Sequence, residues 1–174
     1  TGESLFLATY TSRGEGQQIA LASSFPGSII ALEIGPGREF ICQKSSFLCA
    51  TPGVNLSVEW MRRVGAGLFG GEGFLLQRLS GQGLAFLEID GHVVEKTLAP
   101  GEQLKVNTGN VAAFESSVRY NIETVKGFKN VLFGGEGLFL TVLTGPGRVW
   151  LQTISMPEFA QKIIPFLPTP SSGN

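Results

Sequence analysis

Two glycine-rich turns of the same sequence are the first places in this chain where chemistry could reside. Phe69 and the turn Gly70-Gly71-Glu72-Gly73 recur as Phe133 and the turn Gly134-Gly135-Glu136-Gly137. Such turns can present several backbone N–H groups to a phosphate. The phosphate-loop pattern, however, requires a lysine followed by a hydroxyl residue, which both turns lack, and the glutamate opposes an anion. We therefore interpret these ten residues as a structural or interface motif, in which glycine permits positive φ or a close backbone approach.

Basic side chains precede both turns and are the candidate anion contacts: Arg62, Arg63, Lys126 and Lys129. Two interpretations are open, namely a solvated loop in each copy, or an anionic partner that is bound once per copy. The formal net charge is −1 and the pI is near 5.8. General nucleic-acid binding needs clustered lysine and arginine. The sequence therefore does not favour nucleic acid as a partner.

Cysteine and histidine are too few to build a familiar nucleophilic or metal centre. The chain contains Cys42, Cys49 and a single histidine, His92, and it has no G-x-S-x-G motif. We interpret the cysteines as buried free thiols, with a disulfide or a metal pair as the alternative. His92 directly follows Asp90-Gly91, which predicts a solvent-facing position. The sequence thus predicts no catalytic residue, no metal ligand and no cofactor, and therefore a protein that is not an enzyme.

Paired carboxylates are the remaining option for acid–base chemistry. Glu59 and Glu123 hold matching places, as do Glu72 and Glu136, and either pair could approach in space. Matching places in two copies favour structural equivalence over catalysis.

An internal repeat must position all of these residues. Leu68–Glu88 recurs as Leu132–Gln152, an offset of 64 residues, and a degraded third copy at Gly2–Ser12 resembles Gly71–Gly81. Each copy is expected to be one supersecondary unit. We predict a single all-β domain over residues 1–168, with a truncated first repeat at 1–40, a second at 41–104 and a third at 105–168. Because the chain opens with Thr1 in the middle of a repeat, we expect a fragment or a trimmed product.

The local pattern predicts short strands almost everywhere, because runs rich in Val, Ile, Leu and Phe are separated by Gly, Pro, Asn and Ser. Asp90-Gly91 is a strong signal for a tight hairpin, and Gln82-Gly83 and Pro146-Gly147 are looser ones. A helix is predicted over residues 156–164, with Ser155 as its N-cap and proline after it. We expect a disordered tail over residues 169–174. The predicted strands are Ser4–Tyr10, Gln18–Ala22, Ile29–Ile34, Phe40–Gln43, Phe47–Thr51, Val54–Trp60, Phe74–Ser80, Leu84–Ile89, His92–Leu98, Leu104–Asn107, Val111–Glu115, Val118–Thr124, Leu138–Thr144 and Arg148–Ile154.

The composition favours an assembly of several chains. Charged residues make up 16% of the sequence and the mean hydropathy is +0.19, which is apolar for a soluble monomer. No apolar run reaches the roughly 18–20 residues that span a bilayer. We therefore predict no transmembrane segment and a homo-oligomer that hides apolar surface in subunit contacts.

Three motifs resemble a known family. They are LFGGEG at Leu68–Gly73 and Leu132–Gly137, LTGPGRVWLQT at Leu143–Thr153 and SFPGSII at Ser24–Ile30. Together they resemble the mitochondrial biogenesis (altered inheritance of mitochondria) family, and nearly the whole chain is similar to its uncharacterised bacterial members. The resemblance implies an internally repeated antiparallel β-sandwich or double-stranded β-helix like that of the tryptophan RNA-binding attenuator protein. It also implies a homotrimer and, from fungal relatives, a link to mitochondrial inner-membrane organisation. The family defines no catalytic residues.

Two functions follow as hypotheses. The first is a non-enzymatic oligomeric β-scaffold for protein interaction or assembly, linked to membrane organisation. The second is a ring-type protein that binds a small ligand or a nucleic acid through the four basic residues. A bacterial chain is expected in the cytoplasm and a eukaryotic one in mitochondria.

Overall fold

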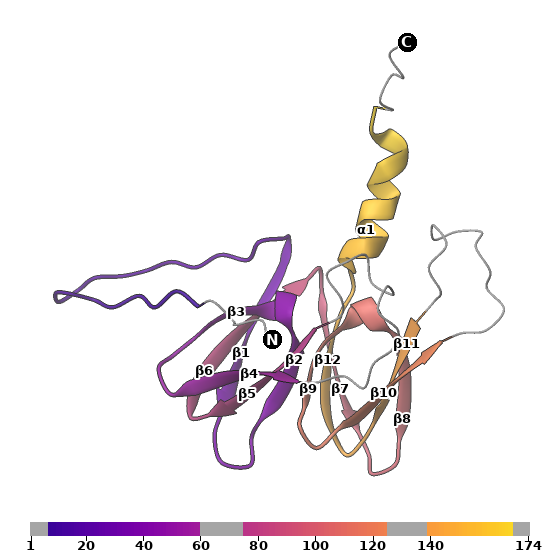
Figure 1. Cartoon of the computed structure of the whole chain (residues 1–174), viewed down its shortest axis with the longest axis horizontal. Helices are drawn as coiled ribbons and strands as arrows, with labels where there is room; N and C mark the ends of the chain where they lie inside the picture. Colours follow the sequence, from indigo (N-terminus) through magenta and orange to yellow (C-terminus); the bar gives the residue numbers. More distant parts are fainter. Residues whose placement is uncertain (1–6, 60–74, 125–138, 169–174) are drawn as a thin grey trace.

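The computed structural model describes residues 7–59, 75–124 and 139–168 of the chain. Antiparallel strands dominate it and one short helix follows them, so the predicted all-β class with a C-terminal helix is confirmed. Figure 1 shows two β lobes side by side, with the helix projecting from one end and a long arm from one side. The elements are β1 Gly27–Ile34, β2 Phe40–Gln43, η1 Lys44–Ser46, β3 Phe47–Ala50, β4 Val54–Glu59, β5 Leu76–Gly81, β6 Gly83–Asp90, β7 Val93–Leu98, β8 Gln103–Asn107, η2 Thr108–Asn110, β9 Val111–Glu115, β10 Arg119–Thr124, β11 Phe139–Thr144, β12 Gly147–Gln152, α1 Met156–Ile163 and η3 Ile164–Phe166.

Two predicted strands are wrong as far as the structure describes them. Residues 7–22 contain no strand, although strands were expected at Ser4–Tyr10 and Gln18–Ala22. These residues form the exposed arm of Figure 1. A strand needs a neighbour for its backbone hydrogen bonds. The described part of the chain supplies none here, so apolar alternation alone does not produce a strand.

The strands form three antiparallel sheets. Their orders are β1-β6-β3, β10-β11-β8 and β4-β5-β2-β9-β12-β7. Pairings of the first half recur in the second half with an offset of 64 residues: Phe40 faces Leu79 in β2–β5, and Leu104 faces Leu143 in β8–β11. The strand pairing divides the described strands into two corresponding sets, β1–β6 and β7–β12. It does not test the boundaries of the three repeats expected from the sequence, so these boundaries stay a prediction.

None of the three predicted hairpins forms. The strands before and after Asp90-Gly91 are β6 and β7, which lie in different sheets. The same is true of β5 and β6 around Gln82-Gly83, and of β11 and β12 around Pro146-Gly147. Tight turns here carry the chain from one sheet to another, because each strand finds its partners in segments far along the sequence. The turn residues identified the corners correctly, but they could not identify the partners.

The six-stranded sheet lies between two apolar clusters. On β2, Phe40 and Cys42 belong to one cluster and Ile41 to the other. On β12, Val149 and Trp150 divide in the same way. Strands that are buried on both faces read as continuous apolar runs. This double burial explains the unbroken sequences Phe40-Ile41-Cys42 and Val111–Phe114.

The C-terminal helix α1 agrees with its prediction within one residue. Pro157 stands in its first turn and Glu158 near its positive dipole end. Ser155 is the N-cap, as expected, but its side chain makes no capping hydrogen bond, and its backbone carbonyl accepts one from Phe159 instead. The rings of Phe25 and Phe159 meet edge to face at 5.0 Å, which fixes the helix against the segment before β1.

Candidate functional site

The candidate interface motif and the candidate anion contacts lie outside the part of the chain that the structure describes. This holds for the two glycine-rich turns and for the four basic residues before them. Their role as an interface motif or as anion contacts stays a prediction. They are Phe69, Gly70, Gly71, Glu72, Gly73, Phe133, Gly134, Gly135, Glu136, Gly137, Arg62, Arg63, Lys126 and Lys129.

The two thiols and the histidine are described, and they do not come together as a site. Both cysteines are free, as predicted. Cys42 is buried in β2, and burial raises the pKa of its thiol to about 12. Cys49 in β3 is partly exposed, so the expectation of two buried thiols holds only for Cys42. His92 is exposed, as expected.

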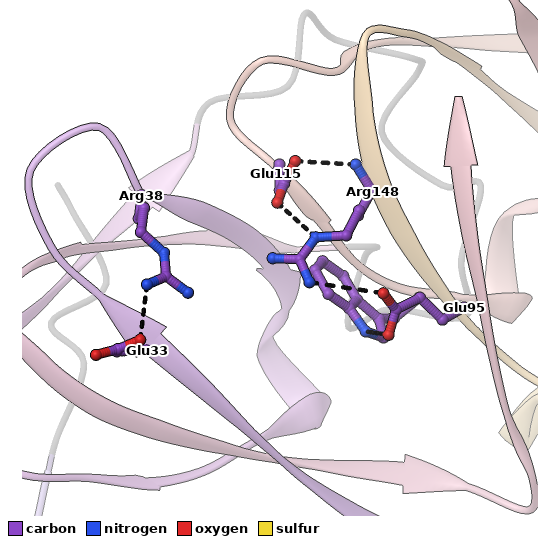
Figure 2. A network of polar contacts seen from close by, with 6 residues as sticks. Glu33, Arg38, Glu95, Glu115 and Arg148 are labelled. Atoms are coloured by element: carbon purple, nitrogen blue, oxygen red, sulfur yellow. Dashed lines mark hydrogen bonds and ion pairs between the residues drawn. The ribbon is translucent and has the colours of Figure 1, made fainter. Parts of the chain in front are cut away.

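The structure instead shows a polar hollow between β1, β7 and β12. Its volume is about 390 Å³. The backbone corner before β2 brings Arg38 to one side, and β12 brings Arg148 to the other (Figure 2). Trp150, on the same strand as Arg148, also lines the hollow. Arg148 and Trp150 are two residues apart on one strand, a spacing that places both side chains on the same face. This site was not predicted from the sequence; the spacing of Arg148 and Trp150 in the GPGRVWLQ run is the signal that could have indicated it.

Arg148 is the centre of the polar contacts in the hollow (Figure 2). Its Nε donates to Glu115 Oε1 at 2.8 Å, and its Nη1 lies 3.6 Å from Glu95 Oε1. Its guanidinium carbon lies 5.1 Å from the centroid of the Trp150 ring. The hydrogen bond to Glu115 and the charges of both glutamates raise the pKa of Arg148, although partial burial opposes the rise. The guanidinium of Arg148 therefore stays positively charged, and the carboxylates of Glu115 and Glu95 already balance its charge.

The remaining polar groups of the hollow are also paired. Arg38 Nη1 donates to Glu33 Oε2 at 2.6 Å, and the buried Trp150 donates its indole N–H to Glu95 Oε2 at 3.0 Å. The residues that line the hollow include no serine, threonine, cysteine or histidine. The arrangement can orient side chains and can admit a small polar group, but its lining offers no hydroxyl, thiol or imidazole for catalysis.

Two further polar clusters brace the sheets. Arg78 on β5 donates from Nε to Glu59 Oε2 on β4 at 3.0 Å. It also donates from Nη1 to Oε2 of Glu39, directly before β2, at 3.0 Å. Hydrogen bonds to these two carboxylates raise the pKa of Arg78. Glu59 thus forms an ion pair with Arg78, and Glu123 forms one with Lys105 at 2.7 Å. Both engagements agree with the structural interpretation of these glutamates.

The base of the exposed arm is held by a nearly buried carboxylate. Glu88 on β6 accepts hydrogen bonds from the hydroxyls of Ser23 and Ser24 and from the backbone N–H of Ser24. Bonds to an ionised carboxylate are stronger than neutral ones. Residues 23–24 are therefore anchored, while the arm beyond them stays exposed.

Comparison with known proteins decides the family. The model of the family described as mitochondrial biogenesis AIM24 matches residues 1–154. The chain belongs to this family. Within the described parts of the chain, three or more potential metal-binding side chains do not gather at one place, and no helix is long and apolar enough to cross a membrane.

Relatives of this AIM24-family chain come from a bacterium. An uncharacterised protein of Streptococcus pyogenes serotype M6 is 30% identical over 173 residues, which is 99% of this chain and 68% of the relative. A crystal structure of another S. pyogenes protein, a structural-genomics target, superimposes with a TM-score of 0.70 at 24% identity. The match covers 84% of this chain but only 63% of the solved one. The family resemblance is confirmed; the attenuator-like fold and the trimer stay predictions.

Proposed function

We propose that this chain is a non-enzymatic, oligomeric β-scaffold that serves protein interaction or assembly. The observation that supports this proposal is the exposure of large apolar side chains on the segments that project from the sheets. Phe166 is 86% exposed after the helix, and Tyr10 is 70% exposed on the arm. Ile164 and Leu167 beside Phe166, and Leu7 and Ile19 on the arm, are exposed as well. Large apolar side chains that are exposed close together along one segment support a role in protein contacts.

The described residues offer few groups that could act in catalysis, which supports the non-enzymatic part of the proposal. The arginines of the hollow are engaged by glutamates, and the thiol of Cys42 is held in its neutral form by burial. A nucleophilic site needs an activated thiol or hydroxyl beside a base. Among the residues that the structure describes, His92, which is exposed, and Cys49 form no such pair.

Light scattering over a dilution series tests the scaffold proposal. We expect the mass of an oligomer that falls toward the monomer as the protein is diluted. The double variant Ile164→Ser/Phe166→Ser should dissociate at a higher concentration, while Lys162→Ser, on the adjoining helix α1, should behave as the wild type. A wild-type chain that runs as a monomer at every concentration would remove the proposal.

A cellular role follows at a coarser level. We place the chain in the cytoplasm of a bacterium, since its relatives are bacterial, with mitochondria as the alternative for a eukaryotic source. A link to membrane organisation rests on the family resemblance. Association with vesicles during flotation would support that link, and recovery only in the vesicle-free fraction would oppose it.

A binder of small ligands or nucleic acid is the second candidate, and the hollow is the observation that favours it. Arg38 and Arg148 face a volume of about 390 Å³. An anion there must displace Glu33, or Glu95 and Glu115, from the guanidinium groups. We therefore expect neither a nucleotide nor a short RNA to raise the Tm at low salt. A rise that Arg148→Ala abolishes and Arg13→Ala keeps would make this the better function.

A further inference from the structure

Strand β1 is an edge strand, and its open side borders the polar hollow. Among the strands that the structure describes, β1 pairs only with β6. Four consecutive residues of β1, Ile30–Glu33, line the hollow. Consecutive residues of a strand point to opposite faces, so all four can line one hollow only along the edge of the strand. The backbone of β1 is therefore part of the wall of the hollow.

The hydrogen-bond pattern shows which backbone groups of β1 stay open. The N–H of Gly91 donates to the carbonyl of Pro26 at 2.9 Å, so this opposed pair is hydrogen-bonded at the start of the β1–β6 ladder. Bonded and non-bonded pairs alternate along antiparallel strands, so the even-numbered residues of β1 bond to β6 and the odd-numbered ones do not. The N–H and C=O groups of Ala31 and Glu33 thus point away from β6. Within the described parts of the chain, no group bonds to them.

The opposite wall of the hollow is one face of the six-stranded sheet. Glu95 on β7 lies opposite Trp150 on β12. Val93 and Arg148 are two residues from these positions and therefore share their face. Leu32 of β1 and Trp150 belong to one apolar cluster, so the inner face of β1 is turned toward this sheet. A segment that paired with the open edge of β1 would lie over the sheet and direct every second side chain to it.

The charges of the hollow favour a cation as its occupant. Its ion pairs (Figure 2) comprise two guanidinium groups and three carboxylates, so one negative charge is left over. These groups belong to Arg38 and Arg148, and to Glu33, Glu95 and Glu115. The contact between Glu95 and Arg148 is the loosest, at 3.6 Å, and the Glu95 side chain is 50% exposed. A carboxylate has about four acceptor sites, so Glu95 can accept a further ammonium or guanidinium group.

We propose that the hollow is a docking site for an extended segment of a partner protein that carries a lysine or an arginine. The segment pairs with the open edge of β1, and its basic side chain enters the hollow and meets Glu95. Strand addition of this kind takes its affinity from main-chain hydrogen bonds and its specificity from alternate side chains. The inference rests on the protein-interaction part of the proposed scaffold, for which it names a kind of partner.

Fluorescence anisotropy of a labelled peptide tests the docking site. The peptide TVTKTVT surrounds one lysine with strand-forming residues, and it can shift along β1 until the lysine meets Glu95. The matched peptide TVTETVT reverses the charge and keeps the other residues. We expect the lysine peptide to bind about tenfold more tightly at low salt, and its binding to weaken as salt screens the charges. Equal binding of the two peptides, or binding of neither, overturns the proposal.

One pair of variants tests the charge. Glu95→Gln removes the carboxylate but keeps an oxygen that can accept the indole N–H of Trp150. It should weaken binding of the lysine peptide by about three- to fivefold, the range of a partly exposed ion pair. Glu15→Gln, on the exposed arm, is the control and should bind as the wild type. An unchanged affinity of Glu95→Gln would show that the basic side chain lies elsewhere.

A second pair of variants tests the backbone contact. Ala31→Pro removes an N–H that β6 does not use, a change that edge strands tolerate, and it should abolish peptide binding. Thr97→Pro makes the same change on β7, where the N–H of Thr97 likewise points away from β12 but Thr97 does not line the hollow. This control should bind the peptide as the wild type does. Full binding by a folded Ala31→Pro variant overturns the pairing with β1.

Amide hydrogen exchange, followed by NMR, gives a measurement on the wild-type chain, which decides the case if Ala31→Pro does not fold. In the free protein, the amides of Ala31 and Glu33 should exchange faster than those of Ile30 and Leu32, which bond to β6. Saturation with the lysine peptide should slow the exchange at Ala31 and Glu33. Unchanged exchange at both amides, with the peptide bound, shows that it binds elsewhere and overturns the proposal.

The outcomes separate the docking site from the scaffold. If light scattering shows an oligomer but the lysine peptide does not bind, the docking site is wrong and the scaffold stands. If the peptide binds to a chain that stays monomeric, the docking site stands and the oligomeric scaffold fails. If the chain is monomeric and binds no peptide, both fail.

Discussion

At the residue scale, the charged groups at the hollow, on β5 and at the base of the arm are paired within the fold. Arg148 is bound by Glu115 and Glu95, Arg78 by Glu59 and Glu39, and Glu88 by three donors from Ser23 and Ser24. These groups hold strands and turns in place. Their role is therefore to position strands and turns. The consequences that can be tested at this scale concern the reactivity of thiols and the pH dependence of stability.

Cys42 is expected to be inert while the chain is folded. Burial raises the pKa of its thiol from 9.0 to about 12, so at pH 8 its thiolate fraction is roughly a thousandfold lower than that of an ordinary cysteine. In the Cys49→Ser variant, a thiol reagent should react only after denaturant is added. Rapid labelling of the native variant would contradict the buried position.

Asp90 is expected to weaken the fold at neutral pH. Burial, and then the nearby Glu88 carboxylate, raise the pKa of Asp90 above its ordinary value of 3.8. An acid with a raised folded-state pKa contributes stability below its unfolded pKa and loses it as the pH rises through the folded pKa. Asp90→Asn should therefore raise the Tm at pH 7 and have no effect near pH 3. Glu15→Gln, on the exposed arm, is the control and should change neither.

At the element scale, the corners between sheets decide where each strand goes. At Gly81, at the end of β5, φ is +93° and a Cβ would lie 2.2 Å from the carbonyl oxygen of Gly53. At Gly83, which begins β6, φ is +149° and a Cβ would lie 2.4 Å from Thr51 Oγ1. Gly81 thus permits a close approach of two backbone segments, and Gly83 a close approach of the Thr51 side chain, which a Cβ would prevent.

Substitution at such a corner should be costly. Gly81→Ala is expected to lower the free energy of unfolding by about 1–3 kcal/mol, because it combines strained backbone with a clash against a carbonyl oxygen. Gly35→Ala meets open space at an ordinary φ and should stay within about 0.5 kcal/mol of the wild type. Urea denaturation measures both. Equal stability of the two variants would show that the Gly81 corner is not tight.

Apart from the two strands expected within residues 4–22, sequence patterns were accurate for element type and position. Phe40–Gln43 and Val111–Glu115 have the predicted bounds, and the helix ends one residue early. Apolar alternation and turn residues are local signals, so they mark strands and corners well. The hairpin predicted at Asp90-Gly91 fails for the same reason, because the partners of β6 and β7 lie tens of residues away.

At the scale of the whole molecule, one continuous sheet makes the halves interdependent. Phe40 on β2 and Trp150 on β12 meet edge to face at 5.6 Å within one apolar cluster, although they belong to different halves. The β2–β9 pairing runs between them. We therefore expect the described strands to unfold together.

Phe40→Ala tests this coupling. The ring is 1% exposed, so its removal should lower the free energy of unfolding by about 3–5 kcal/mol. The measurement uses a Trp60→Phe background, so that Trp150 is the one tryptophan. In this background, the fluorescence of Trp150 and the far-UV circular dichroism should have the same denaturation midpoint, both in the protein with Phe40 and in the Phe40→Ala variant. Two separate transitions would show that the halves fold independently.

The polar hollow shows why sites are harder to predict than strands. Arg148 and Trp150 share a face of β12 by spacing alone, but Glu115, Glu95 and Arg38 reach the same place from other segments. The glycine-rich turns attracted attention because they are repeated, and they lie outside the described residues. Repetition points to shared architecture, whereas this hollow joins charged residues whose positions in the other half hold uncharged ones: Leu84, Ala31 and Thr51 correspond to Arg148, Glu95 and Glu115.

The sequence by itself determined the family, the all-β class, the strands and the corners, because apolar periodicity, glycine and proline act over a few residues. Only the tertiary structure decided which strands pair, which sheet is buried on both faces, and which edges stay open. Those choices depend on backbone hydrogen bonds and packing between segments far apart in the chain, for which the local pattern carries no record. The arm at residues 7–22 shows the limit most clearly: its residues alternate like a strand, yet no described neighbour completes it.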